Sequence, residues 1–224
     1  MSFTLLIAGL ATSAALGGVL PSPFSSAASI QHYFLAHSDA VRASGIFAFA
    51  SSVPLAIYAA TASARLRQLE VTAPGATIAL AGGLLSAGAL GLSGLFQWTL
   101  SRPAVRGDAA LVRALHDLSF VTGGPGHVVA LGLLIAGIAV PALILRLLPR
   151  PLAWAGLIIA AVAELTTLVL IWPSLAVLLP IARFPGLIWL IVAGFRLPKR
   201  IRSGRASDSP DARLPSAHAA GPVG

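Results

Sequence analysis

The chain has 224 residues, of which 57% are hydrophobic and only 10% are charged, and its formal net charge at pH 7 is +8. Its mean hydropathy is +0.89. Soluble domains are about a quarter charged and just under half apolar, so this composition excludes an ordinary soluble enzyme and a disordered chain. The absence of cysteine excludes a disulfide scaffold. The composition predicts a helical membrane protein.

A helix needs about 20 mostly apolar residues to cross the hydrocarbon core of a bilayer. Six segments meet this requirement, and they predict an all-α polytopic bundle of six transmembrane helices over residues 3–20, 40–64, 75–100, 126–148, 152–172 and 183–197. The last is short unless residues after Pro173 lengthen it. Continuous rather than alternating apolar runs exclude a transmembrane β-barrel. The first segment has no basic residue before it, so we expect a retained helix rather than a signal peptide.

Two shorter helices are expected outside the spans. Residues 25–36 place Ile30, Tyr33 and Phe34 on one side, which predicts an amphipathic helix resting on the outer membrane surface. Residues 108–121 form an approach helix to the fourth span. The Gly-Gly-Pro-Gly sequence at 123–126 predicts a break that lets this helix lie at an angle.

Small residues repeat every fourth position in the third span, at Gly83, Ala87 and Gly91. Small residues let the backbones of transmembrane helices pack closely, which is a main source of helix association in lipid. We therefore expect the third span at the centre of the bundle, with the alanine-rich fifth span as its partner. The four tryptophans mostly lie near helix ends and are predicted to be interfacial anchors.

Basic residues near the helix ends predict the orientation. With the N-terminus inside, the inner face carries ten of the 15 basic residues, namely Arg65, Arg67, Arg146, Arg150, Arg196, Lys199, Arg200, Arg202, Arg205 and Arg213. The outer face carries Arg42, Arg102, Arg106, Arg113 and Arg183. Both termini are therefore predicted to be cytoplasmic. The basic tail, residues 201–224, is predicted to be disordered, and Lys199, Arg200, Arg202 and Arg205 to meet anionic lipid headgroups.

Glu164 is the clearest polar anomaly, because it falls about twelve residues into the fifth span. An ionised carboxylate at that depth is costly unless it is paired. Glu164 is therefore either a proton, substrate or counter-ion site, or a protonated side chain with a structural hydrogen bond. Thr166 and Thr167 are expected to hydrogen-bond back to their own helix.

Arg113, His116 and Asp117 share one face of the approach helix, so Arg113 and Asp117 can pair. They form either an interfacial salt bridge or the mouth of a cavity that ends at Glu164, which Arg183 can join. His32, His37, His116 and His127 fall in the outer half, but none has a metal-ligand spacing such as His-x-x-x-His, and we predict no metal site.

Gly91-Leu92-Ser93-Gly94 resembles the serine motif of rhomboid intramembrane proteases, which are also six-helix proteins. Those enzymes need a histidine from another helix, and His127 is at a compatible depth. The match covers four residues, differs in helix order, and lacks the family's His-x-x-x-Asn element. An intramembrane serine hydrolase is therefore a minor alternative.

A broader resemblance covers most of residues 1–200. It is carried by residues 182–191 (ARFPGLIWLI) with Gly194 and Pro198, by Leu-His-Asp at 115–117 followed by Gly-Gly-Pro-Gly, and by the turn Leu-Leu-Pro-Arg at 147–150. These motifs resemble small bacterial six-helix integral membrane proteins of an uncharacterised domain-of-unknown-function family. That family has no established activity, so the resemblance implies a location in the bacterial cytoplasmic membrane and no catalytic residues.

The residues together favour a multi-pass membrane protein that is not an enzyme and that binds a small molecule, a lipid or a proton. The expected site is a pocket open to the outer leaflet, built by Glu164, Ser93, Gln97, Arg113, His116, Asp117, His127 and Arg183. An accessory subunit of a larger membrane complex is the alternative, and a homodimer is compatible with both. The chain has no nucleotide-binding or thiol motif, so no cofactor is predicted, and the positive-inside pattern accounts for its basicity without nucleic acid.

Overall fold

The computed structural model describes residues 21–69 and 74–198, together with a few single positions between residues 4 and 15. Apart from those positions, the expected first span at residues 3–20 lies outside the described residues, as does the expected tail at residues 201–224. Within the described part every regular element is helical, which confirms the all-α fold class.

The helices are α2 (Ala27–Ala36), α3 (Ser38–Gln68), α4 (Gly75–Leu100), α5 (Pro103–Arg106), α6 (Ala109–Val121), α7 (His127–Ile144), α8 (Arg150–Leu165) and α9 (Leu178–Arg196). Three short turns of helix join or extend them: η1 (Thr122–Gly126), η2 (Thr166–Leu170) and η3 (Pro173–Val177). Five helical segments of the described part are long and apolar enough to cross a membrane: Ser38–Gln68, Gly75–Leu100, Ala109–Ile144, Arg150–Leu170 and Pro173–Arg196. By helix length and hydropathy the chain is a multi-pass membrane protein.

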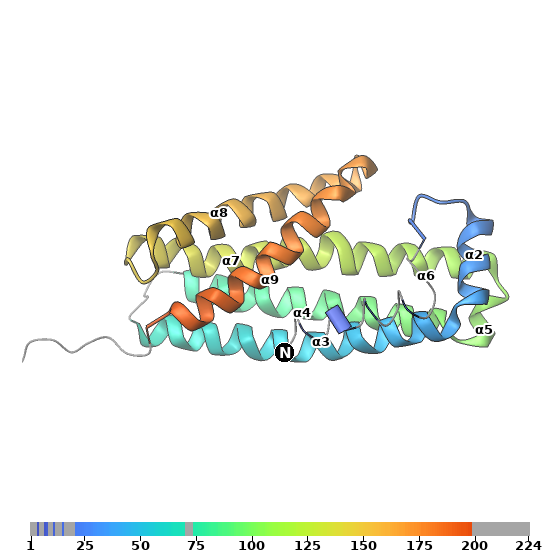
Figure 1. Cartoon of the computed structure of the whole chain (residues 1–224), viewed down its shortest axis with the longest axis horizontal. Coiled ribbons are helices and arrows are strands. Elements are labelled where there is room, and N and C mark those ends of the chain that lie inside the picture. The colour runs from blue at the N-terminus through green and yellow to red at the C-terminus, as the bar shows by residue number, and fades with distance from the viewer. Residues whose placement is uncertain are drawn as a thin grey trace, which may run out of the picture.

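The long helices lie side by side, with α4 between α3 and α7 and with α8 on the other side of α7 (Figure 1). Helix α9 starts near the far end of α8 and crosses the bundle obliquely, to finish where α3 ends and α4 begins (Figure 1). The expected central position of α4 is confirmed. The expected pairing of α4 with α8 is wrong, because α7 separates the two.

Glycines allow the close approach of α4 to both of its neighbours. A Cβ atom on Gly83 would overlap the Cβ of Ala59 in α3, and one on Gly91 would lie 3.2 Å from Ser52 Oγ, also in α3. On the other face of α4, a Cβ on Gly82 would lie 2.5 Å from the backbone nitrogen of Leu134 in α7. The hydrophobic effect contributes little to helix association in lipid, so close backbone packing of this kind stabilises the bundle instead.

The predicted break at Gly123–Gly126 is wrong. Helices α6 and α7 are collinear and are joined by η1, a π-helical turn, into one helical segment from Ala109 to Ile144 (Figure 1). Pro125 cannot donate a backbone hydrogen bond, and a π turn accommodates this by shifting the register instead of ending the helix. The approach helix and the fourth span are therefore one crossing helix.

The apolar side of α2 packs on protein. Ile30 and Phe34 are fully buried and contact Val41 of α3, Leu100 of α4 and Val112 of α6. A helix is therefore present where residues 25–36 predicted one, but its apolar residues join a small core that closes this end of the bundle.

Candidate functional site

A cavity of about 340 Å³ lies between α3, α4, α6, η1 and the first turns of α9. This volume is at the lower end of the range for small-molecule sites. The cavity, here called the Arg183 cavity, is lined by Pro21, Pro23, Ser44, Phe47, Ala48, Leu90, Ser93, Gln97, His116, Ser119, Phe120, Gly123, Gly124, Leu179, Pro180, Arg183 and Phe184. The described walls are mainly apolar, with a few polar groups, as is usual for a ligand pocket.

Arg183 is positioned by the π turn. In η1 the N–H of His127 bonds to the carbonyl oxygens of Thr122 and Gly124, and the carbonyl of Gly123 accepts a hydrogen bond from Arg183 Nη2. The Nε atom of Arg183 is buried and has no hydrogen-bond partner among the described residues. The π turn at Pro125 directs the N–H of His127 to Thr122 and Gly124, so the Gly123 carbonyl is available to the guanidinium of Arg183.

No described carboxylate neutralises Arg183. Asp39 and Asp117 each pair with an arginine one turn away on their own helix. Asp108 accepts hydrogen bonds from the first backbone amides of α6. Glu164 does not line the cavity. Among the described residues, therefore, no carboxylate balances the charge of Arg183 next to its apolar walls.

Three further polar side chains line the cavity near the Ser93–Ser119 contact or beside it: Ser93, Gln97 and His116. Ser93 Oγ donates to the carbonyl oxygen of Ser119 at 2.8 Å, and Gln97 Nε2 lies 3.4 Å from Ser93 Oγ. His116 is 5% exposed and stacks edge-on against Phe34, with 5.3 Å between ring centroids. Its Nε2 atom is buried and has no hydrogen-bond partner within the described part of the chain.

The structure therefore brings together four of the eight predicted site residues: Ser93, Gln97, His116 and Arg183. Arg113 and Asp117 pair through Nε and Oδ2 at 3.0 Å, which confirms the predicted ion pair, but neither lines the cavity. Arg113 also donates to the backbone oxygen of Ser25 at 3.0 Å, so it fastens the segment before α2 to α6.

His127 lies in the core instead of the cavity. It is fully buried, and its Nδ1 atom lies 2.9 Å from Ser86 Oγ and 3.0 Å from the Ser86 carbonyl oxygen. Ser86 Oγ also donates to the His127 carbonyl oxygen at 3.0 Å. One arrangement satisfies all three contacts, with the proton on Nδ1 donated to Ser86 and Ser86 donating to the carbonyl. The pair is therefore a structural link between α4 and α7.

Glu164 is exposed at the junction of α8 and η2, away from the Arg183 cavity. Its Oε1 atom lies over Gly132 of α7, where a Cβ atom would be 3.4 Å away. Thr166, two residues later, donates to the Ala163 carbonyl at 2.6 Å, which confirms the expected bond to its own helix. Glu164 is thus separated from the residues that were expected to surround it.

The arrangement gives no support to a serine nucleophile. Ser93 bonds to Ser119, and His127 bonds to Ser86, so the expected pairing of Ser93 with His127 is not formed. Over the described residues, no group of three His, Asp or Glu side chains is close enough to hold a metal ion.

Ser119 and Gly123 are among the lining residues that the sequence analysis did not predict. Ser119 is one turn after His116 on the same helix, a spacing that could have identified it. Gly123 gave no such signal, because Gly-Gly-Pro-Gly is far more common in loops than in π turns. A Cβ atom at Gly123 would overlap Ser93 Oγ, so glycine is required for α6 and α4 to meet here.

No family model matches the chain, and no curated protein or solved structure matches it. The geometry of the described residues, with the sequence, is therefore what supports a function.

Proposed function

We propose that this multi-pass membrane protein binds a small organic anion with an apolar body in the Arg183 cavity. The observation that carries the proposal is a half-buried guanidinium that lines a cavity, whose buried Nε–H has no partner among the described residues and which faces no described carboxylate. A buried charge of this kind is costly unless a counter-charge is supplied. A bound carboxylate or phosphate would supply it.

The remaining lining residues suit such a ligand. Arginine presents parallel N–H donors that fit the two oxygens of a carboxylate or phosphate. Phe47, Phe120 and Phe184 provide apolar surface for the body of the ligand. His116 Nε2 and the amide of Gln97 can hydrogen-bond to a second polar group on it. No step of bond making or breaking is needed, so the proposal is for a binding protein rather than an enzyme.

The test uses decanoate, a medium-chain carboxylate, and full-length protein held in amphipol. We expect equilibrium dialysis with radiolabelled decanoate to show saturable binding to the wild type. Arg183→Gln should weaken it at least tenfold, because the counter-charge is lost, and Arg183→Lys should weaken it about threefold or less. Decanol, which has the same chain and no charge, should bind the wild type at least tenfold more weakly.

Arg42→Gln is the matched control, since it removes an arginine from the same end of the bundle, one that pairs with Asp39 and does not line the cavity. It should bind decanoate like the wild type. Ser44→Phe fills the cavity without touching Arg183 and should also abolish binding, which keeps the test valid if Arg183→Gln misfolds. Unchanged binding in both cavity variants, or equal binding of decanol, would refute the proposal.

A second candidate function rests on Glu164. At 1.5 Å per residue, Glu164 lies about 21 Å along α8 from Arg150, within the roughly 30 Å hydrocarbon core. Its side chain is nevertheless exposed, and no described residue forms an ion pair with it. We propose that a neighbouring membrane subunit, or a second copy of the chain, hydrogen-bonds to it.

Native mass spectrometry after gentle extraction tests this candidate. We expect an assembly larger than one chain in the wild type, at least a fivefold loss of it in Glu164→Ala, and retention of about half in Glu164→Gln, which keeps a hydrogen-bonding side chain. Leu165→Ala, at a neighbouring exposed position, is the control and should assemble normally. A wild type that is monomeric and gives no cross-linked partner in its native membrane would contradict the idea.

We also propose that residues 3–20 add a sixth span to the five described, that both termini are cytoplasmic, and that the membrane is the bacterial cytoplasmic membrane. The excess of basic residues at one end of the helices supports the orientation. The resemblance to uncharacterised bacterial six-helix proteins supports the location.

A further inference from the structure

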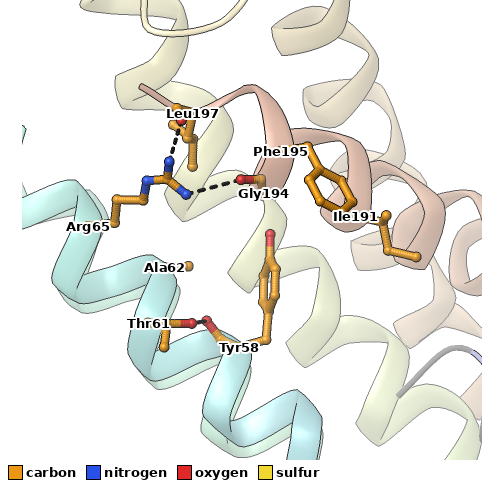
Figure 2. A pocket seen from close by; sticks show the side chains of 8 residues that line it. All are labelled: Tyr58, Thr61, Ala62, Arg65, Ile191, Gly194, Phe195 and Leu197. Carbon is orange, nitrogen blue, oxygen red and sulfur yellow. Dashed lines mark hydrogen bonds between the residues drawn. The ribbon is translucent and has the colours of Figure 1, made fainter. Parts of the chain in front are cut away.

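A second cavity, of about 410 Å³, lies between the last turns of α3 and α9, at the opposite end of the bundle from the Arg183 cavity (Figure 2). Helix α3 contributes Tyr58, Thr61 and Arg65 to its lining, and α9 contributes Ile191, Gly194 and Phe195. The sequence analysis expected anionic headgroups at Lys199 and Arg200 but predicted no binding site at Arg65.

Arg65 links α3 to the end of α9 and still has N–H groups that are free to donate hydrogen bonds. Its Nη1, Nη2 and Nε atoms donate to the carbonyl oxygens of Gly194, Leu197 and Pro198 at 3.1, 2.6 and 3.3 Å (Figure 2 draws the first two). A guanidinium has five N–H groups, so two remain after these three bonds. The carbonyls are neutral, and no ion pair with Arg65 exists in the described part of the chain.

The other polar side chains of the lining, Tyr58 and Thr61, already donate hydrogen bonds to backbone carbonyls. The hydroxyl of Tyr58 uses its one proton on the Leu190 carbonyl, at 2.6 Å, and the ring of Tyr58 lines the cavity (Figure 2). The hydroxyl of Thr61 bonds to carbonyls of its own helix at 2.9 Å. Phe195 is 86% exposed and forms the outer edge. The cavity thus has a cation at one end and hydrocarbon along its length.

The surroundings of this cavity are basic. At the same end of the bundle α3 finishes with Arg65 and Arg67, the turn between α7 and α8 carries Arg146 and Arg150, and α9 finishes with Arg196 (Figure 1). None of the described carboxylates is at this end, and in the sequence one acid, Glu70, follows the end of α3. Lys199 and Arg200 follow directly in the sequence after Pro198, whose carbonyl Arg65 holds. Clusters of this kind attract the anionic headgroups of a membrane leaflet.

We propose that this cavity binds one anionic phospholipid, with its phosphate at Arg65 and an acyl chain along Ile191 and Phe195. Guanidinium and phosphate form strong, charge-assisted hydrogen bonds, and the two unused N–H groups of Arg65 are available for them. The exposed ring of Phe195 and the side chain of Ile191 give an acyl chain a path into the bilayer. The site is independent of the Arg183 cavity.

Native mass spectrometry of the full chain in dodecyl maltoside tests the site, with phosphatidylglycerol and phosphatidylcholine of identical chains as probes. We expect the wild type to retain one phosphatidylglycerol at least fivefold more than phosphatidylcholine. Arg65→Gln should remove that preference. Thr61→Trp, which fills the cavity without touching the hydrogen bonds of Arg65, should remove it as well, so the test does not depend on whether Arg65→Gln folds normally.

Arg67→Gln is the matched control, because Arg67 is exposed at the same end and does not line the cavity. It should retain phosphatidylglycerol within twofold of the wild type. An equal loss in Arg67→Gln would reveal diffuse charge attraction, and full retention in Thr61→Trp would place the lipid elsewhere; either result overturns the proposal. Displacement of the lipid by glycerol phosphate, which has no acyl chain, would show a site for a soluble phosphate and would also overturn it.

Discussion

Replacing Gly137 by leucine is expected to lower the stability of the bundle by about 3 kcal/mol, at the upper end of what overpacking costs. Gly137 lies where α7 meets α4, and a Cβ atom there would be 2.5 Å from the backbone nitrogen of Ala79 and 2.8 Å from its Cα atom. Backbone atoms in the middle of a helix cannot move aside alone. The two helices must separate, which also breaks the neighbouring contact between Gly82 and Leu134.

Thermal unfolding in dodecyl maltoside, followed by circular dichroism, measures the effect, and a fall in Tm of about 10 °C is expected. Gly88→Leu is the matched control. It lies on the same crossing helices, but nothing is within 4 Å of a Cβ atom at Gly88, and the position is exposed. Its Tm should equal or exceed that of the wild type, because leucine is a better helix former than glycine. Equal losses in both variants would show that the α4–α7 contact is not the determinant.

Trp189→Ala is expected to have an effect of similar size, a loss of about 3–5 kcal/mol. Although tryptophan was predicted to be an interfacial anchor, Trp189 is 3% exposed and lies between α9 and α8. Its Nε1 atom donates to the Leu152 carbonyl at 2.7 Å, and its ring covers Gly156, where a Cβ atom would be 2.5 Å from the ring. Truncation leaves a cavity the size of an indole and removes this hydrogen bond.

The same unfolding measurement applies, with Trp154→Ala as the control. Trp154 is on α8, on the far side from the packed face, and is 56% exposed. Its loss should change stability by less than about 1 kcal/mol, because an exposed side chain loses few packing contacts when it is truncated. If Trp154→Ala proved as destabilising as Trp189→Ala, burial of the indole would not explain the effect.

Four of the eight residues predicted for the site line the Arg183 cavity, for a physical reason. Ser93, Gln97, His116 and Arg183 are polar residues in apolar helices, and such residues face protein more often than lipid. The prediction put Glu164 at the centre because it is an acid in a span. Which way one residue faces depends on the rotation of its helix, and α8 presents Glu164 outward while α9 presents Arg183 inward.

Composition and the lengths of the apolar runs were enough to predict an all-α, multi-pass membrane protein. Backbone N–H and C=O groups in hydrocarbon must be hydrogen-bonded, and a helix forms these bonds within a single segment. The bounds of α4, Gly75–Leu100, coincide with the range that hydropathy gave. The spacing of Arg113 and Asp117 likewise determined their pairing, since that contact lies within one helix turn.

Tertiary structure alone decided the rest. It placed α7 rather than α8 beside α4, turned Trp189 into the bundle, and continued the helix through Pro125. In each case the deciding contact joins residues far apart in the chain: Gly137 with Ala79, Trp189 with Leu152, and Arg183 with Gly123. Local pattern cannot specify such contacts, because hydropathy says that a helix spans the membrane but not which of its faces meets which neighbour.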